Sequence, residues 1–208
     1  MPTDAPDAYL APYRDAHEVH GSSFGVTLWA SPRSQRRRFE VLTQMVFLAG
    51  KRVLDAGCSR GDLAAFLLRC GIGYGQYIGV DGLASVIAFA QSRGLPRAQF
   101  HCGDFLAQPE LLAIGQPQVI VISGTLNTMD FDTAMRVLEA AWAAAGESLI
   151  FNFLSDRAGP GAPPQALPAR RHDALRLLDW ATRRTCSVQF RQDYFKHGHD
   201  ATILMRKR

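Results

Sequence analysis

Hydrophobic positions along the chain switch between two spacings, and this alternation predicts strands that are each followed by a helix or loop. Short apolar runs, typical of strands that are covered on both faces, occur five times before residue 155. They span residues 51–56, 76–81, 98–104, 118–124 and 148–154. Around and between them, apolar residues recur every three or four positions, which is typical of amphipathic helices at 36–49, 62–69, 83–92 and 131–145.

The segment after the fifth strand follows a different pattern. Residues 155–168 are rich in Gly and Pro and are expected to form an irregular loop. A helix is expected at 171–184, followed by strands at 187–195 and 201–207 whose short turn at 196–200 makes them an antiparallel hairpin. The chain therefore predicts an α/β fold: a mostly parallel seven-stranded sheet with helices on both faces and a C-terminal antiparallel hairpin.

The first 32 residues lack this alternation. They are rich in Pro, Gly and Asp, and we interpret residues 1–32 as a loosely structured arm with one short helix at 13–19. Residues 33–208 are expected to form a single domain, which suits a chain of 208 residues.

Composition places the chain among ordinary globular proteins. Hydrophobic residues make up 47% and charged residues 20%, and no apolar run approaches the roughly 18 residues that a membrane helix needs. The N-terminal residues show no secretory pattern, and the four cysteines show neither a C-x-x-C pair nor zinc spacing. We therefore expect a cytoplasmic protein with reduced thiols, no membrane association and no metal site.

The formal net charge of +4 is unevenly distributed. Basic residues cluster at 33–39, 169–176, 183–184 and 206–208. Such clusters can attract nucleic acid, but no aromatic stacking motif accompanies them, and solvated helix faces explain them equally well.

The candidate chemistry begins in the stretch VLDAGCSRG, residues 53–61. Asp55, Gly57 and Gly61 stand where a buried strand passes into a helix, with the spacing D-x-G-x-S-x-G rather than G-x-G-x-x-G. A carboxylate at this turn repels phosphate and attracts an ammonium group, which disfavours a nicotinamide dinucleotide.

Two more acids end the next two strands. Asp81 lies 24 residues beyond Gly57, where a carboxylate can accept both hydroxyls of a ribose. Asp104, beside Phe105, can receive an exocyclic amine next to an aromatic face. Each acid alone could be only a helix N-cap. Together they describe a ligand with an ammonium group, a ribose and an adenine, which is S-adenosylmethionine.

On these motifs the sequence resembles the class I S-adenosylmethionine-dependent methyltransferases, in particular small bacterial single-domain members. VLDAGCSRG is similar to their glycine-rich first motif, with Ser59 where glycine is more usual, and YIGVDG and HCGDF are similar to the second and third. The resemblance runs from about residue 36 to the C-terminus and implies a Rossmann-like fold. The implied cofactor-binding residues are Asp55, Gly57, Cys58, Ser59, Gly61, Asp81, Gly82, Asp104, Phe105, Ser123 and Gly124.

The resemblance also implies a role for each group. Asp55 and Gly57 would contact the methionine end, Asp81 the ribose, and Asp104 with Phe105 the adenine. The backbone of Ser123 and Gly124 would border the sulfonium.

Residues outside these motifs are candidates for closing the site and for catalysis. The arm is expected to act as a lid that excludes water, with Trp29 covering the cofactor. Arg38 could hold the methionine carboxylate through two hydrogen bonds. His20 and Asn127 are the weak candidates for orienting or deprotonating an acceptor, and no catalytic base is identified.

The methyl acceptor is less well defined by sequence. The segment after the fourth strand, SGTLNTMD, lacks the N/D-P-P-Y/F/W block of enzymes that methylate adenine N6, and no cysteine lies there to attack cytosine C5. We expect transfer to oxygen or nitrogen of a small molecule by a monomer or homodimer. An RNA methyltransferase and a non-catalytic cofactor-binding partner subunit are the alternatives.

Overall fold

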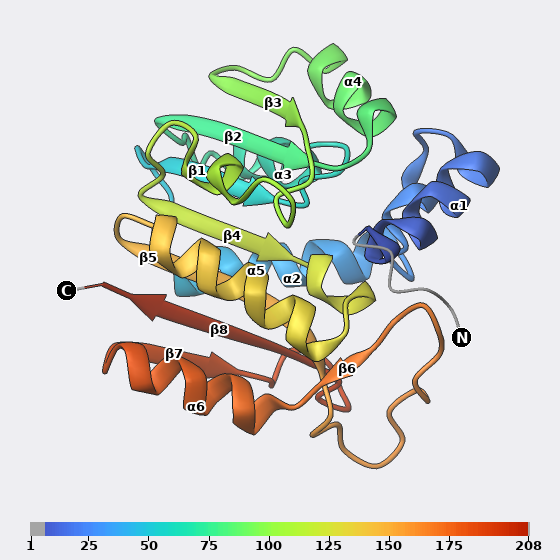
Figure 1. Ribbon diagram of the computed structural model, residues 1–208, viewed down its shortest axis with the longest axis vertical. Helices are drawn as coiled ribbons and strands as arrows, with labels where there is room; N and C mark the ends of the chain where they lie inside the picture. The colour runs from blue at the N-terminus through green and yellow to red at the C-terminus, as the bar shows by residue number, and fades with distance from the viewer. Residues whose placement is uncertain (1–6, 208) are drawn as a thin grey trace.

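One mixed β-sheet forms the centre of the molecule in the computed structural model, which describes residues 7–207 (Figure 1). Its strands follow the spatial order β3-β2-β1-β4-β5-β8-β7, and a two-residue strand, β6, pairs with β5. The strands are β1 (Arg52–Ala56), β2 (Gln76–Asp81), β3 (Ala98–Cys102), β4 (Val119–Ser123), β5 (Ser148–Ser155), β6 (Arg171–His172), β7 (Val188–Arg191) and β8 (Asp200–Arg206).

Strand direction reverses only at the β8 side of the sheet. Strands β1 to β6 pair in parallel, whereas β8 is antiparallel to both β5 and β7. The predicted α/β fold, mostly parallel with a C-terminal antiparallel pair, is therefore confirmed. The sheet has eight strands rather than seven, because the start of the expected helix at 171–184 pairs with β5 as β6.

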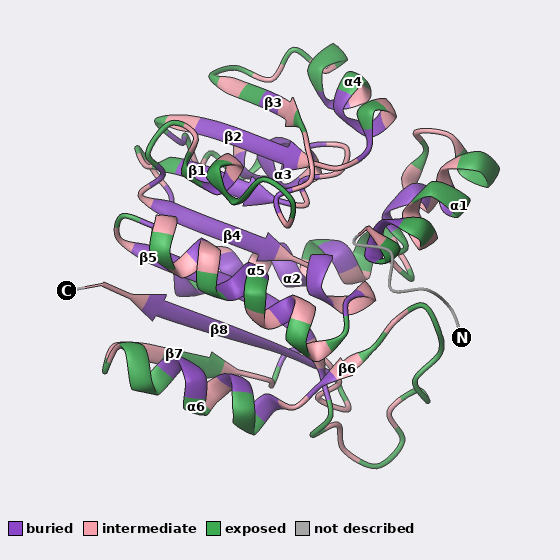
Figure 2. Ribbon diagram, viewed as in Figure 1, coloured by how far each residue is buried: buried purple, intermediate pink, exposed green. Residues whose placement is uncertain are grey.

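Helices cover both faces of the sheet, as the continuous apolar strands require. The helices are α1 (Ala11–His20), α2 (Pro32–Met45), α3 (Asp62–Arg69), α4 (Ala84–Ser92), α5 (Phe131–Ala144) and α6 (Ala174–Arg184), with 3-10 turns η1 (Ala8–Leu10), η2 (Phe24–Thr27), η3 (Pro109–Ala113) and η4 (Thr125–Thr128). α5 and α6 pack on one face, α2 and α3 on the other. The central strands are buried along most of their length (Figure 2).

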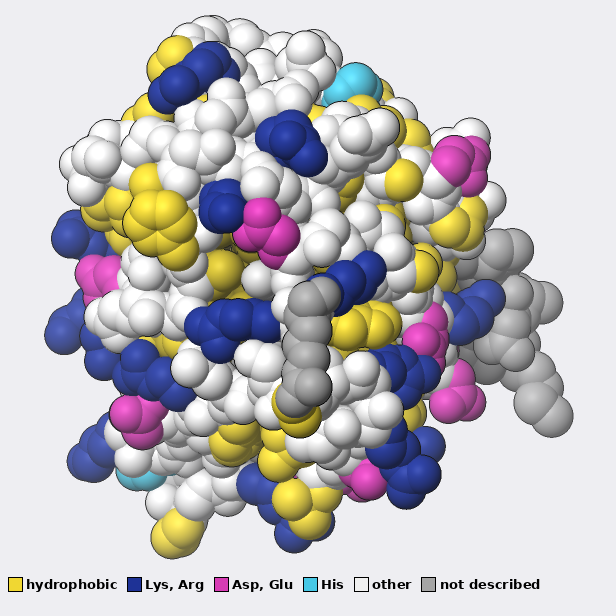
Figure 3. All heavy atoms as spheres, turned by 90° about the vertical axis from the view of Figure 1, so that its left-hand side faces the viewer, with side chains coloured by type: hydrophobic (Ala, Val, Ile, Leu, Met, Phe, Trp, Pro, Cys, Tyr) yellow, Lys and Arg dark blue, Asp and Glu magenta, His cyan; other side chains and the backbone are white. Residues whose placement is uncertain are grey.

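The two edges of the parallel strands differ. The amino ends of the parallel strands and the end of β8 lie on the face shown in Figure 3. On this face, Lys and Arg side chains are scattered among acidic, apolar and neutral ones. A defined ion pair on this side joins Lys51 to Glu147 at 2.8 Å. The carboxyl ends lie at the opposite edge, where parallel α/β sheets bind ligands.

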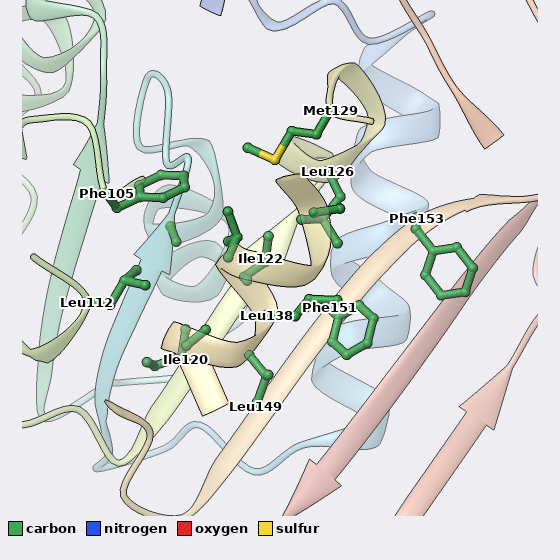
Figure 4. Packing of buried hydrophobic residues seen from close by; sticks show 14 of the residues in the cluster. Phe105, Leu112, Ile120, Ile122, Leu126, Met129, Leu138, Leu149, Phe151 and Phe153 are labelled. Carbon is green, nitrogen blue, oxygen red and sulfur yellow. The ribbon is translucent and has the colours of Figure 1, made fainter. Parts of the chain in front are cut away.

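The core beneath α5 fixes the position of β4 and the loop that follows it. Ile120 and Ile122 of β4, Leu138 of α5 and Phe151 of β5 are each fully buried in one cluster (Figure 4). Leu126 of η4 belongs to the same cluster, so the turn after β4 is held by core packing rather than by loop contacts alone.

Several element boundaries differ from expectation, for local reasons. α2 begins at Pro32 rather than 36, because Ser31 and Ser34 form a capping box, and it ends at Met45, short of 49. The expected arm boundary at 32/33 thus falls at the first residue of α2. The arm contains η1, α1 and η2 rather than one short helix, and its residues 1–6 lie outside the described part of the chain.

Candidate functional site

A cavity of about 430 Å³ lies at the carboxyl edge of the parallel strands. Its floor includes Gly57 after β1, Asp81 at the end of β2 and Gly124 after β4. The N-terminal arm and the proline-rich segment 163–169 form its walls. Of the sequence-predicted site residues, ten line the cavity: Trp29, Arg38, Gly57, Ser59, Asp81, Gly82, Phe105, Ser123, Gly124 and Asn127.

Asp81 is fixed by backbone hydrogen bonds. Its Oδ2 accepts from the Ser59 amide at 2.9 Å and its Oδ1 from the Leu83 amide at 3.0 Å. Burial raises the pKa of this carboxyl above its usual range, while the amides of Leu83 and Ser59 oppose the rise. An ionised carboxylate offers about four acceptor sites, so both oxygens can accept further hydrogen bonds from a ligand in the cavity.

The turn after β1 needs glycine for a packing reason. Gly57 has φ +80°, and a Cβ there would lie 2.0 Å from Thr125 Oγ1. Thr125 in turn donates a hydrogen bond from Oγ1 to the Ala56 carbonyl at 2.9 Å. The close approach that Gly57 permits is therefore between the β1 and β4 turns, which places both turns at the cavity floor. Ser59 has φ +46°, a conformation that glycine adopts more easily.

Three residues of the first motif lie behind the cavity floor. Asp55 is 3% exposed and accepts a hydrogen bond from the Tyr77 hydroxyl. Its burial raises the pKa of the carboxyl to about 7. Cys58 is buried, and Gly61 is the N-cap of α3 with φ +68°. None of the three is among the residues that line the cavity.

Asp104 forms a hydrogen bond with a residue of the N-terminal arm. Its Oδ1 accepts hydrogen bonds from the Tyr9 hydroxyl at 2.6 Å and from the Leu106 amide at 2.8 Å. Tyr9 and Phe105 both line the cavity, with ring centroids 6.4 Å apart, whereas Asp104 does not line it. Because both bonds end on Oδ1, Oδ2 is the oxygen of Asp104 left for another donor.

The end of β4 is organised by Asn152 on the neighbouring strand. Asn152 Oδ1 accepts from the Gly124 amide at 2.8 Å, and its Nδ2 donates to Ser123 Oγ at 3.1 Å. The Trp29 ring lies directly against Gly124, where a Cβ would come within 2.4 Å of the indole. Asn127 lines the cavity, but its Oδ1 already accepts from the Leu154 amide at 3.0 Å.

Arg38 is buried and held on several sides. Its Nε and Nη2 each donate to Asp200 at 2.5 Å, and its guanidinium lies 4.3 Å from the Trp29 ring and 4.8 Å from the Phe195 ring. Its Nη1 is buried without a hydrogen-bond partner among the described residues. One edge of the guanidinium is therefore structural, and Nη1 remains for a ligand.

His20 lies away from the cavity. Its ring packs against Gly25 at the start of η2, where a Cβ would come within 2.5 Å of the imidazole. Neither His17 nor His20 is among the lining residues. Within residues 7–207, no group of three or more His, Cys, Asp or Glu side chains is placed to hold a metal ion.

Sequence reasoning missed several polar lining residues, among them Tyr9, Gln165, Arg171 and His199. Tyr9 comes from the arm, Gln165 and Arg171 from the segment around the proline-rich loop, and His199 from the turn before β8. His199 stands in an H-x-H pattern at 197–199, and its Nε2 lies 3.4 Å from the carboxylate of the next residue, Asp200. No local motif marks the other three.

Comparison with known proteins agrees with this geometry. Residues 53–145 match the family described as "Methyltransferase domain". No curated protein matches the sequence. The part of the chain that matches the family contains both turns of the cavity floor and the strand ends that carry Asp81 and Gly124.

Solved structures share the fold at low identity. The magnesium protoporphyrin IX methyltransferase of Synechocystis PCC 6803 with bound S-adenosylhomocysteine has a TM-score of 0.64 at 16% identity, over 96% of this chain and 94% of that one. The phosphoethanolamine N-methyltransferase 1 of Haemonchus contortus has a TM-score of 0.67 at 12% identity, over 97% of this chain and 48% of that one. The small RNA methyltransferase HEN1 has a TM-score of 0.66 at 15% identity, over 83% of this chain and 25% of that one.

These structures establish the fold, and the family match within it establishes the domain. The mostly parallel sheet, the glycine turn after β1 and the acid at the end of β2 are the features that the sequence predicted. Residues 53–145 are therefore a methyltransferase domain, and the chain has the fold of S-adenosylmethionine-dependent methyltransferases.

Proposed function

We propose that the enzyme transfers the methyl group of S-adenosylmethionine to an oxygen or nitrogen atom of a small-molecule acceptor. The observation that carries this proposal is a continuous cavity that extends from Asp81 at β2 to Leu154 at β5 and Arg171 at β6. Three strand spacings separate β2 from β5, about 14 Å. A volume of about 430 Å³ lies within the range of small-molecule sites.

The cofactor would occupy the β2–β4 part of the cavity. We propose that Asp81 and Gly82 contact the ribose, and that Asp104 Oδ2 and Phe105 contact the adenine. The turn at Gly57 and Ser59, backed by buried Asp55, Cys58 and Gly61, would border the methionine end. Arg38 Nη1 would hold its carboxylate.

The remaining part of the cavity lies beyond the end of β4. Ser123 and Gly124 would border the sulfonium, so an acceptor would enter next to Asn127 and Leu154. The bound cofactor supplies an already activated methyl group. The protein then contributes alignment of the acceptor and exclusion of water, and alignment alone gives effective molarities of about 10⁵ M or more.

The arm is proposed to be the lid of this site. Tyr9 and Leu10 lie over the ribose and adenine side, and a Cβ on Gly82 would come within 2.8 Å of the Leu10 side chain. Trp29 covers the floor at Gly124. Segments that cover both sides of the floor can exclude water once the cofactor is bound.

The test is transfer of a radiolabelled methyl group to a panel of phenols, carboxylic acids and amines, compared with total bacterial RNA. We expect transfer to at least one small-molecule class and none to RNA. Transfer to RNA alone would overturn the proposal. Binding of S-adenosylhomocysteine without transfer to any of these would point instead to a non-catalytic cofactor-binding subunit. We propose that the reaction takes place in the cytoplasm.

RNA is the second candidate acceptor, because basic residues gather beside the cavity. Arg33, Arg36, Arg37 and Lys196 border a shallow depression formed by α2 and the turn before β8. Arg36 and Arg37 are both paired with Glu40, at 3.0 and 3.5 Å, which lowers the charge available to phosphates.

Within residues 7–207, no helix is long and apolar enough to cross a membrane.

A further inference from the structure

The acceptor end of the cavity contains an arginine without a counter-ion. Arg171, the first residue of β6, lines the cavity and forms no ion pair with any described residue. Its Nη1 donates to the Ser155 carbonyl at 2.8 Å and its Nη2 to the Pro163 carbonyl at 2.7 Å. These two carbonyls fix the guanidinium but do not neutralise it. Of its five N–H donors, three remain.

Neighbouring charges do not compensate for Arg171. Asp200, the nearest buried acid on this side, is engaged by Arg38 through two hydrogen bonds of 2.5 Å. His199 also lines the cavity, and its burial and the charges of Arg38 and Arg171 lower the pKa of the imidazole, so the ring is neutral at pH 7. Asp81, the acid that lines the cavity, stands at the β2 end. The acceptor end therefore has a net positive charge.

A second donor lies beside Arg171. Gln165 lines the cavity, and its Oε1 accepts from the Arg171 backbone amide at 2.9 Å. This bond identifies Nε2 as the side of the Gln165 amide that can donate to a ligand. The other lining residues of this segment are apolar: Leu154, Pro163, Pro164, Ala166, Pro168 and Ala169. A fixed guanidinium beside an amide donor forms a site for an oxyanion, because charge-assisted hydrogen bonds are roughly twice as strong as neutral ones.

We propose that the methyl acceptor is an anionic small molecule whose carboxylate or phosphate group is bound by Arg171 and Gln165. This inference rests on the proposed function, since it places the acceptor beyond the end of β4. The anionic group would anchor the acceptor at β6 and direct another part of the molecule toward the floor at Gly124.

The test measures binding to protein saturated with S-adenosylhomocysteine, by calorimetry, so that it does not depend on turnover. The probes are matched carboxylates and primary amides, benzoate with benzamide and 4-hydroxybenzoate with 4-hydroxybenzamide, together with phenyl phosphate. We expect the anions to bind at least ~10-fold more tightly than the amides. A preference for phenyl phosphate or for the carboxylates would identify the anionic group.

Arg171→Gln is expected to weaken anion binding by ~10-fold or more and to leave amide binding and S-adenosylhomocysteine affinity unchanged. Arg171→Lys should restore part of the anion affinity. Arg170→Gln removes the same charge from an exposed neighbour outside the cavity lining and serves as the control. If Arg171→Gln instead disturbed the loop around residues 163–169, the binding of the amides would be weakened as much as that of the anions.

Equal binding of anions and amides, absence of anion binding, or an Arg171→Gln variant that binds anions as tightly as the unaltered protein would each overturn the proposal. If the unaltered protein did not bind S-adenosylhomocysteine, this result would instead contradict the proposed function.

Discussion

At the scale of single residues, Asp81 is the acid whose surroundings are best suited to a ribose. In the proposed site, Asp81→Ala would leave the two ribose hydroxyls without their acceptor, which costs about 1.5–3 kcal/mol. We therefore expect the affinity for S-adenosylhomocysteine to fall roughly 10- to 150-fold, as measured by calorimetry.

Asp130 provides the matched control for this variant. It accepts from the Thr133 amide at 2.7 Å as the N-cap of α5, and it is outside the cavity lining. Asp130→Ala should lower the free energy of unfolding by about 1 kcal/mol and leave cofactor affinity unchanged. Equal affinities for Asp81→Ala and Asp130→Ala would contradict the role given to Asp81.

Asp55 makes the stability of the fold depend on pH. Its folded pKa of about 7 lies above the ordinary value of 3.8, so the folded state binds more protons between about pH 4 and pH 7. The free energy of unfolding should therefore fall as the pH rises through this window. The full effect is on the order of 2–4 kcal/mol.

Urea denaturation at about pH 5 and pH 8 measures this dependence. Asp55→Asn keeps a hydrogen-bond acceptor for the Tyr77 hydroxyl but does not titrate, so its stability should change less between the two pH values. A variant that loses as much stability as the unaltered protein would show that Asp55 is not the responsible group.

At the scale of elements, one buried ion pair joins α2 to the first residue of β8. Arg38 and Asp200 are 5% and 0% exposed. Asp200→Ala would leave the guanidinium charge buried without compensation, which costs about 3–5 kcal/mol. The exposed pair Arg183–Asp179 within α6 is the control, and Asp179→Ala should cost about 0.5 kcal/mol or less. Similar losses in urea denaturation would contradict the structural role of the buried pair.

The arm gives a second prediction at this scale. η1, α1 and η2 contact the rest of the molecule through a few side chains, among them the Tyr9 hydroxyl on Asp104. If the arm is a lid, binding of S-adenosylhomocysteine should slow amide hydrogen exchange in residues 9–29, because opening of the segment becomes less frequent. Exchange in α6, which contributes no residue to the cavity lining, is the internal reference. Unchanged exchange in the arm would exclude a lid.

Sequence patterns predicted the elements of the whole molecule better than the contacts between them. The succession of strands and helices along the chain followed from apolar periodicity, and the methyltransferase resemblance followed from three strand-end motifs, since both depend on neighbouring residues. The pairing of Arg38 with Asp200, 162 positions apart, and of Tyr9 with Asp104, 95 apart, follows from tertiary structure and has no local pattern. β6 was missed because two residues carry no periodicity.

The distribution of charge over the whole molecule separates the two candidate acceptors. The net charge of +4 is modest, and several arginines are paired, including Arg36 and Arg37 with Glu40 and Arg184 with Glu139. A protein that binds single-stranded RNA through its phosphates loses affinity with salt at a log–log slope of about 0.7 per contact.

We therefore expect any RNA binding to be weak and to disappear between about 50 mM and 200 mM salt, as measured by fluorescence anisotropy. Binding of S-adenosylhomocysteine should change little over the same range, because its proposed contacts lie inside a cavity that screening ions reach poorly. The double variant Arg33→Gln, Lys196→Gln removes two cations of the depression that form no ion pair within residues 7–207, and it should abolish residual RNA binding. Tight RNA binding that survives 200 mM salt would require contacts to bases, and it would make RNA the favoured acceptor.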